Sequence, residues 1–472
     1  MSDTAIVWFR RDLRLADHPA LDRARGAHAA VVPVFVWDPE AEGDWAPGAA
    51  SRWWLHHSLI ELDKALRKRG SQLVIARGDT ASELLRIRNA CGASAVYWNR
   101  AYEPALVERD QRLKKALREK DLTAESCNGS LLFEPWEMLK DDGQPYLVFT
   151  PFWNRMQKRW ETPAPCPAPR VLDAPRRWPA SLAVDALGLL PGRDWAEGFW
   201  QRWQPGEKAA QRRLDCFIDE AVSGYDQARD RPAEHGTSRL SPHLHWGEVS
   251  PLQVARALEP SGEIPTGQGR WGFLREIAWR EFSAHLLYHY PHLPEAPLKR
   301  QFEAFPWRAR RDYADDLRAW QQGRTGVPMV DAGMRELWQT GWLHNRVRMV
   351  VASFLTKNLL IPWQEGARWF WDTLVDADLG NNTQGWQWSG GCGADAAPYF
   401  RVFNPVLQGQ KFDPQGGYVR RWCPELARRS ARRLHEPLAP GEHCGDYPRA
   451  RVDLKASRQR ALDAYDAIRK AG

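Results

Sequence analysis

The sequence has few cysteines and no apolar run long enough to cross a membrane. Its seven cysteines are scattered over 472 residues without a C-x-x-C pair, which argues against a zinc ribbon, an iron–sulfur cluster or a disulfide framework. The apolar run Ala29–Trp37 falls far short of a membrane span. The first residues also lack the apolar core of a signal peptide. We therefore expect a protein of the reducing cytoplasm, without a membrane partner and without a metal site.

A glycine-rich dinucleotide fingerprint is also missing. No G-x-G-x-x-G follows the first predicted strand, so the pattern does not support dinucleotide binding in the N-terminal layer. What is present is an alternation of short buried strands with amphipathic helices. Strands are expected at 4–9, 29–37, 72–76 and 94–98, and helices at 51–69, 80–90 and 106–120. This order predicts a doubly wound parallel sheet, forming an α/β domain over residues 1–130.

Prolines are concentrated after this region. Seven prolines lie between Pro163 and Pro191, a composition that favours an extended, solvent-exposed connector. We expect an inter-domain linker over 131–206. From 207 to 472 the pattern is almost wholly helical, with helices expected at 207–222, 271–289, 328–340, 343–360 and 364–374. The predicted fold class is thus an α/β domain, a long linker and a larger all-α domain.

Tryptophan is unusually abundant, with 26 copies in the chain. Core filling seldom needs so many, so stacking surfaces and redox-active side chains are two hypotheses for some of them. The net charge of +7 is compatible with a polyanionic partner but does not require one.

One predicted helix carries charged and aromatic residues on a single face. Glu276, Trp279, Arg280 and Ser283 follow i, i+3, i+4, i+7 spacing. Because buried charges need partners, this face is expected to line a pocket. The alternative is an Arg–Glu pair around a core tryptophan.

A second cluster combines Arg348 with Asp376 and Asp378 as candidate carboxylate partners. A structural salt bridge is the more common explanation for any one such pair, and Asn382 follows in a segment that turn residues could explain. The hydroxyl-rich segment 237–241 suits a phosphate, with an ordinary helix N-cap as the alternative.

A series of motifs extends along nearly the whole chain. It comprises Trp8–Leu15 with Asp17, Thr237–Pro242, Glu276–Phe282, Thr325–Ala332, Trp342–Arg346, Asp376–Asp378, Trp386–Trp388 and Asp395–Pro405. In this order they resemble the photolyase/cryptochrome family, and the group that they resemble most is the bacterial class I cyclobutane pyrimidine dimer photolyases.

The resemblance implies FAD in the helical domain, as FADH⁻ in the active form. Arg348 and the two aspartates would form a fixed charge array along polar flavin edges, and Asn382 would offer an amide to flavin N5. The full set implied for the cofactor is Tyr225, Thr237, Ser238, Arg239, Leu240, Ser241, Trp342, Asn345, Arg348, Asp376, Ala377, Asp378 and Asn382.

The implied reaction is light-driven repair of UV-damaged DNA. Excited FADH⁻ passes an electron to a flipped-out cyclobutane pyrimidine dimer, the ring opens and the electron returns; photolyases belong to the enzymes that extrude their target bases. Trp279 and Trp388 would pack the pyrimidines, and Glu276 would stabilise charge on the dimer. Asn345 would contact the same edge, and Met349 would form the floor, where the related (6-4) photolyases are expected to have histidines nearby.

The resemblance also implies an electron relay and a DNA-binding face. Trp386, Trp363 and Trp307 resemble the relay from flavin to surface, with plain core packing as the alternative. The residues implied in DNA binding are Arg229, Glu276, Trp279, Arg280, Asn345, Arg346, Trp388, Gln408 and Lys411. Six arginines at 420, 421, 428, 429, 432 and 433 could add a phosphate-binding rim or form a solvated charged face.

An antenna chromophore is expected in the α/β domain. Leu106 and Pro294-Glu295 depart from the residues of folate-binding relatives, and 5,10-methenyltetrahydrofolate remains the expectation from family frequency alone. The alternative function is a cryptochrome, a blue-light receptor that signals rather than repairs. The family implies a monomer.

Overall fold

The computed structural model describes residues 4–192, 194–395 and 401–471. Its α/β domain contains a five-stranded parallel sheet of order β3-β2-β1-β4-β5. The strands are β1 (Thr4–Phe9), β2 (Ala30–Trp37), β3 (Val74–Arg77), β4 (Ala95–Asn99) and β5 (Thr123–Cys127). The helices are α1 (Pro19–Ala27), α2 (Ala49–Arg67), α3 (Thr80–Cys91) and α4 (Pro104–Arg118). The predicted doubly wound sheet is confirmed.

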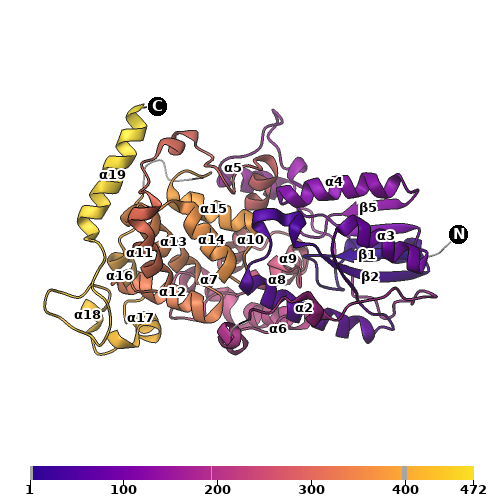
Figure 1. The fold of residues 1–472 in the computed structure, drawn as a ribbon, viewed down its shortest axis with the longest axis horizontal. Helices are drawn as coiled ribbons and strands as arrows, with labels where there is room; N and C mark the ends of the chain where they lie inside the picture. The colour runs from indigo at the N-terminus through magenta and orange to yellow at the C-terminus, as the bar shows by residue number, and fades with distance from the viewer. Residues whose placement is uncertain (1–3, 193, 396–400, 472) are drawn as a thin grey trace.

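The two faces of the sheet have different neighbours. On one face, Leu84 of α3 and Leu117 of α4 pack in a cluster with Ile6 of β1. On the other face, Trp54 of α2 shares a cluster with Trp342 of the helical domain. This second face therefore joins the α/β domain to the helical domain, and Figure 1 shows the two side by side along the long axis.

The linker is more ordered and more buried than its proline content predicts. It contains α5 (Phe149–Lys158) and 3₁₀ turns at Val184–Leu187 and Asp194–Gln201. Leu172, Leu187, Leu189 and Phe199 are buried in the cluster that also contains α2 residues. The expected solvent exposure is wrong at these positions, because the apolar residues between the prolines pack onto the sheet and its helices.

The helical part of the chain begins with α6. Its helices are α6 (Glu207–Cys216), α7 (Tyr225–Ala228), α8 (Ser241–His245), α9 (Pro251–Leu258), α10 (Gln268–His289), α11 (Arg310–Gln321), α12 (Pro328–Thr340), α13 (Asn345–Ser353), α14 (Trp363–Thr373), α15 (Leu379–Gly390), α16 (Pro405–Phe412), α17 (Gly417–Trp422), α18 (Ala431–Leu434) and α19 (Leu454–Ala471). The all-α prediction is confirmed. Two predicted helices, 207–222 and 343–360, instead change into π-helical turns at Phe217–Ala221 and Phe354–Asn358.

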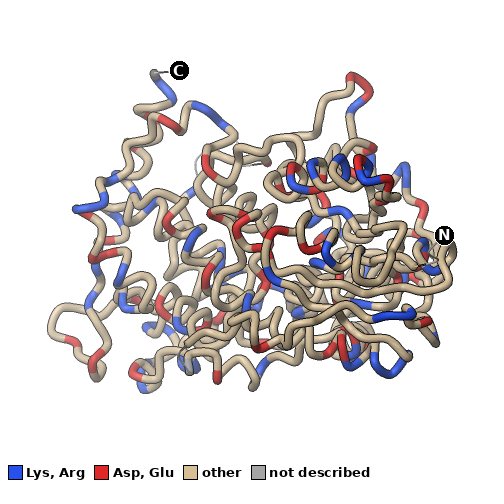
Figure 2. Tube along the Cα trace, turned by 45° about the vertical axis from the view of Figure 1, so that its right-hand side comes forward, with Lys and Arg blue, Asp and Glu red and all other residues tan. Residues whose placement is uncertain are grey.

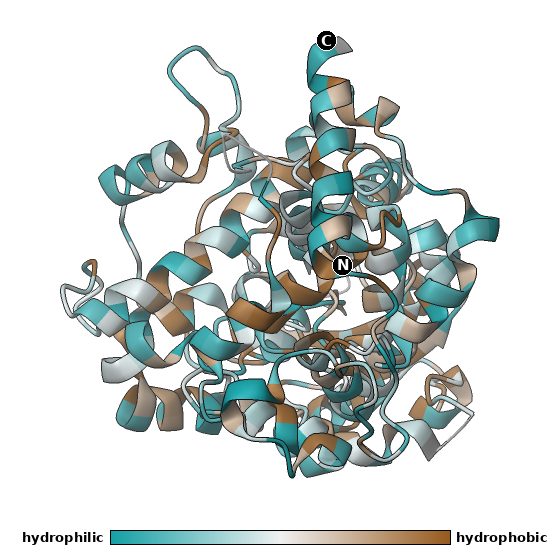
Figure 3. Ribbon diagram, turned by 90° about the vertical axis from the view of Figure 1, so that its left-hand side faces the viewer, coloured by the Kyte–Doolittle hydropathy of each residue, from teal (hydrophilic) through white to brown (hydrophobic). Residues whose placement is uncertain are grey.

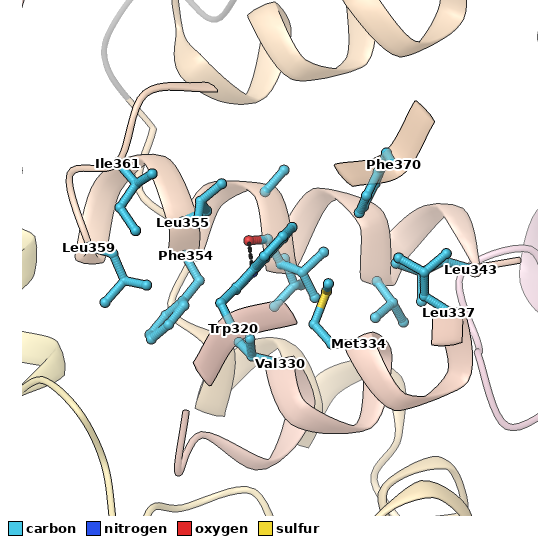
Figure 4. Close-up of a cluster of buried hydrophobic side chains, with 14 of the residues drawn as sticks. Trp320, Val330, Met334, Leu337, Leu343, Phe354, Leu355, Leu359, Ile361 and Phe370 are labelled. Carbon is cyan, nitrogen blue, oxygen red and sulfur yellow. Dashed lines mark hydrogen bonds between the residues drawn. The ribbon is translucent and has the colours of Figure 1, made fainter. Parts of the chain in front are cut away.

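The core of the helical domain is built from α11 to α15. Figure 4 shows Trp320 of α11 between apolar side chains such as Val330 and Met334 of α12 and Phe370 of α14. The Trp320 Nε1–H donates to the carbonyl of Val351 at 3.1 Å. The Trp320 indole thus keeps its polar atom hydrogen-bonded within the core, which is the ordinary structural use of tryptophan.

The surface mixes charges of both signs. Figure 2 shows lysine and arginine interleaved with aspartate and glutamate along the trace. In Figure 3 the C-terminal helix α19 carries hydrophilic and hydrophobic residues in turn, and its Ala461 and Ile468 are buried against the core. Within the described residues, no helix has the length and apolarity needed to span a bilayer.

Candidate functional site

The two unusual helix faces of the sequence lie near each other. They belong to α10 and α13, and α15 packs against both helices. The segment before them also contributes, because α7 packs against α10. Residues from four parts of the chain therefore surround one region of the helical domain.

Glu276 and Trp279 lie on the same partly exposed face of α10. The Glu276 carboxylate accepts a hydrogen bond from Arg229 Nη1 at 2.6 Å. The Trp279 indole stacks on Phe149 with ring centroids 3.7 Å apart and planes 7° apart. Trp279 thus has one face covered by a ring from the linker helix α5, and the indole as a whole stays only partly buried.

α13 begins with the other predicted contact residues. Asn345 is exposed at the first position of the helix, and Met349 is half-buried one turn later. Arg346 Nη2 lies 2.7 Å from Asp230 Oδ2, and the Arg346 guanidinium lies 4.4 Å over the Phe412 ring. Arg346, predicted to bind DNA, therefore has an acidic partner within the protein.

Of the two carboxylates proposed for Arg348, the structure selects Asp376. Arg348 Nη2 lies 2.7 Å from Asp376 Oδ2, and Arg348 Nε donates to the Leu343 carbonyl at 2.7 Å. Asp378 instead caps α15 by accepting from the Asn381 backbone N–H at 2.8 Å. Burial opposes the charge of Asp378, but the neighbouring His245 and Arg280 hold the pKa of its carboxyl below the usual value.

The remaining cofactor candidates supply hydroxyl, amide and aromatic groups. Trp342 Nε1 donates to Ser241 Oγ at 3.2 Å, and the Arg239 guanidinium lies 5.4 Å over the Trp342 ring. The Asn382 amide group donates to the Ala367 carbonyl at 3.0 Å, which leaves its oxygen for a ligand. The N-cap position of α8 is Leu240 and Ser241 is the first residue of the helix, so an ordinary N-cap does not explain the Ser241 hydroxyl.

Other members of the predicted cofactor set are mostly buried. Tyr225 is buried at the start of α7, and burial raises the pKa of its hydroxyl. Leu240 and Ala377 are buried, while Thr237 and Ser238 are half-buried.

His344, which precedes Asn345, has no predicted role. Its Nδ1 accepts a hydrogen bond from the Arg346 backbone N–H at 3.2 Å. Its Nε2 is buried and has no hydrogen-bond partner among the described residues. Burial lowers the pKa of His344 to about 4, so the ring is neutral at pH 7. A neutral buried N–H beside Arg239 and Arg348 fits a ligand that brings acceptor atoms, as the phosphates and ring edges of FAD would.

Trp388, the other expected wall of the lesion site, is half-buried on α15. Its ring centroid is 6.2 Å from that of Phe403, and both residues line a small pocket. Among the described residues, none of the other predicted dimer contacts lines this cavity. Residues 396–400 of the last sequence motif lie outside the described residues.

The three relay tryptophans differ in burial. Trp386 of α15 and Trp363 of α14 are each 2% exposed, and the two helices pack against each other. Trp307 is half-buried and packs on Phe305 with centroids 4.5 Å apart. Trp320, which was not predicted to take part, lies edge-on to Trp386 at 6.1 Å.

The proposed basic rim is only partly available to a partner. Arg429 is buried, with its Nε 3.1 Å from Glu442 Oε1, and Arg433 also contacts Glu442. Arg420 donates to the carbonyls of Ala427 and Arg429. The exposed members are Arg421, Arg428, Arg432 and Arg433, of which Arg433 is the one paired with Glu442. Gln408 is half-buried and Lys411 exposed on α16.

A second, larger cavity is lined by residues of the α/β domain and of the helical domain. The carboxyl ends of β1, β2 and β4 line it. The strand order reverses between β1 and β4, and parallel sheets of this kind bind ligands at the carboxyl ends of the strands beside such a reversal. Two guanidiniums lie over the Trp8 ring, Arg10 at 4.5 Å and Arg109 at 4.7 Å from its centroid. Leu106, which departs from the folate pattern, is in its lining, and Arg280 and Asp378 reach it from the helical side.

Comparisons with known proteins match both halves of the chain. A family model described as the FAD binding domain of DNA photolyase covers residues 273–467, and one described as DNA photolyase covers residues 5–170. The deoxyribodipyrimidine photo-lyase of Agrobacterium fabrum is 47% identical, over 98% of both chains. Cryptochrome-1 of Arabidopsis thaliana is 39% identical over 98% of this chain and 70% of its own.

Solved structures are similar over the full length. A class III photolyase from Agrobacterium tumefaciens superposes with a TM-score of 0.94 at 46% identity, covering 100% of this chain and 98% of its own. The cryptochrome of Synechocystis sp. PCC6803 gives 0.88 at 30% identity, covering 99% and 98%. The predicted fold and FAD as cofactor are confirmed, whereas class I is not, since this class III structure is so similar.

Proposed function

The chain belongs to the photolyase/cryptochrome family, and from that premise we propose that it is a light-driven DNA repair enzyme that splits cyclobutane pyrimidine dimers. The observation that carries the proposal is the partly exposed pair on α10. Trp279 offers an indole already stacked on Phe149, and Glu276, one turn earlier, offers a carboxylate.

A flipped dimer needs an aromatic surface and a polar group at its edge. Trp279 supplies the surface, and Glu276, whose carboxylate is paired with Arg229, supplies hydrogen-bond acceptors for the pyrimidine N–H groups at that edge. Asn345 provides a neutral amide at the exposed start of α13, and Met349 an adaptable apolar floor. This methionine also favours the cyclobutane branch over the (6-4) branch.

FAD, when bound, supplies the light-excited electron for ring opening. Arg348 and Asp376 form an ion pair, and the Leu343 carbonyl holds the Arg348 guanidinium as well. The charges are therefore fixed in place and would orient the polar edges of the flavin ring. Asn382 presents its oxygen because its amide group is committed to Ala367. Ser241 and the His344 N–H would hold acceptor-rich parts of the cofactor, with Arg239 nearby as a positive charge.

The other assignments follow from the same proposal. We assign Trp386, Trp363 and Trp307 to a relay that restores the reduced cofactor, and Arg229, Arg280, Arg346, Gln408 and Lys411 to contacts with DNA. The cavity between the domains would hold the antenna, for which a folate is our assignment. We further propose a cytoplasmic monomer.

The deciding experiment follows dimers under light. Protein with chemically reduced FAD is mixed with a thymine-dimer oligonucleotide, and intact thymines are counted after blue light and in darkness. We expect restoration in the light only. A protein that holds FAD and leaves every dimer intact under light would instead be a receptor, the second candidate, which the similarity to two cryptochromes supports.

A further inference from the structure

The closest aromatic contact near the proposed dimer site comes from outside the helical domain. Phe149 begins α5 in the linker and is 1% exposed. Its ring lies parallel to the Trp279 indole at 3.7 Å, whereas the other ring against Trp279, Phe282, meets it edge-on at 5.9 Å. Among the described residues, Phe149 is therefore the ring that stacks on Trp279.

The position of Phe149 is itself held by neighbours. Its backbone N–H donates to Asp395 Oδ1 at 3.3 Å, and the Asp395 N–H donates to the Leu147 carbonyl at 3.2 Å. The Arg275 guanidinium lies 5.7 Å over the Phe149 ring. These contacts fix the start of α5 against α10, so the stack does not depend on a mobile surface side chain.

A stacking surface binds a base best when it is already in the right orientation, because less side-chain freedom is lost on binding. We propose that Phe149 is a positioning residue for lesion recognition: it holds Trp279 flat from behind, so that one indole face is presented to an extruded dimer. The inference rests on the proposed function and adds the linker helix to the binding site.

Phe152 is a matched control on the same helix. It is also 1% exposed, and its ring contacts Phe282 at 5.2 Å and His285 at 5.2 Å. No ring contact joins Phe152 to Trp279 among the described residues. Phe149→Leu and Phe152→Leu therefore remove the same group from the same cluster, and they differ in contact with the indole.

The test is a double-mutant cycle on the full-length protein with FAD. Dissociation constants for a thymine-dimer oligonucleotide and its undamaged counterpart are measured for wild type, Phe149→Leu, Trp279→Ala, the double variant and Phe152→Leu. We expect F149L to weaken dimer binding about three- to tenfold without changing undamaged binding. In the Trp279→Ala background it should cost nothing, because it acts through the indole.

Two results would overturn the inference alone. In one, F149L and F152L reduce dimer binding equally; in the other, F149L costs as much in the absence of Trp279 as in its presence. A wild type that does not prefer dimer DNA would instead overturn the proposed function and the inference with it. Should F149L not fold, Phe149→Met refills the volume without a ring and enters the same cycle.

Discussion

Asp230 pairs with Arg346, a residue that we propose to contact DNA. It holds Arg346 through two contacts, Nη2 to Oδ2 at 2.7 Å and Nε to Oδ1 at 3.3 Å. Asp230→Asn removes the charge and keeps the shape, so the Arg346 guanidinium is left over the Phe412 ring and free to meet a phosphate. We therefore expect the variant to bind both damaged and undamaged DNA more tightly.

The size of the effect follows from counterion release. One additional phosphate contact steepens the slope of log K against log salt by about 0.9. Over a fourfold range of salt that slope changes affinity about threefold. The pair is partly exposed, with side chains 18% and 34% accessible, so breaking it costs little folding free energy.

The assay is a salt titration of binding to an undamaged duplex. Glu234→Gln is the control, because it removes one negative charge from the same segment and leaves Arg346 paired; its own partner Arg231, 3.1 Å away, is already exposed. We expect the steeper slope in D230N and not in E234Q. Weaker binding by D230N would mean that Asp230 aims Arg346 at DNA, and an unchanged slope would mean that Arg346 does not reach a phosphate.

Three further predictions concern the site and the fold. Trp279→Ala should lose about 1–3 kcal/mol of dimer binding, the value of one base–aromatic stack, and unchanged affinity would remove Trp279 from the site. Trp386→Phe should prevent light from reducing oxidised FAD, followed by absorbance, while protein reduced beforehand still repairs; normal photoreduction would exclude Trp386 from the relay. Burial raises the pKa of Glu336 to about 7, above its value in the unfolded chain, so the unfolding free energy should fall as pH rises from about 4.5 to 7. In Glu336→Gln this part of the fall should be absent in denaturant titrations, and an identical pH profile would contradict the raised pKa.

Local pattern was enough to predict the sheet and most helices. β1 and β4, which cover or nearly match the strands expected at 4–9 and 94–98, are buried on both faces, and their sequences are nearly continuous apolar runs. β5 was not predicted, because it is an edge strand in which Ala124 alone is buried. In the helix expected at 343–360, apolar residues recur at helical spacing throughout. Nothing in this spacing indicates the change to a π-helical turn at Phe354.

In the candidate site, the sequence predicted the residues but not their partners. Charged and aromatic residues at helical spacing were enough to indicate which faces of α10 and α13 contribute to the candidate site. Partners came from elsewhere in the chain: Arg346 meets Asp230 across 116 positions, and Trp279 stacks on a residue of the linker. Such pairs are set by tertiary packing. The sequence alone therefore could not predict whether Arg348 pairs with Asp376 or with Asp378.

The most direct test of this account is a crystal structure of the protein with FAD and a thymine-dimer oligonucleotide. We predict that the dimer is extruded from the helix, with one pyrimidine on the Trp279 face opposite Phe149, Glu276 at its edge, and FAD beneath it among Trp342, Arg348 and Asn382. A dimer left in the stacked duplex, or bound away from Trp279 and the flavin, would contradict it.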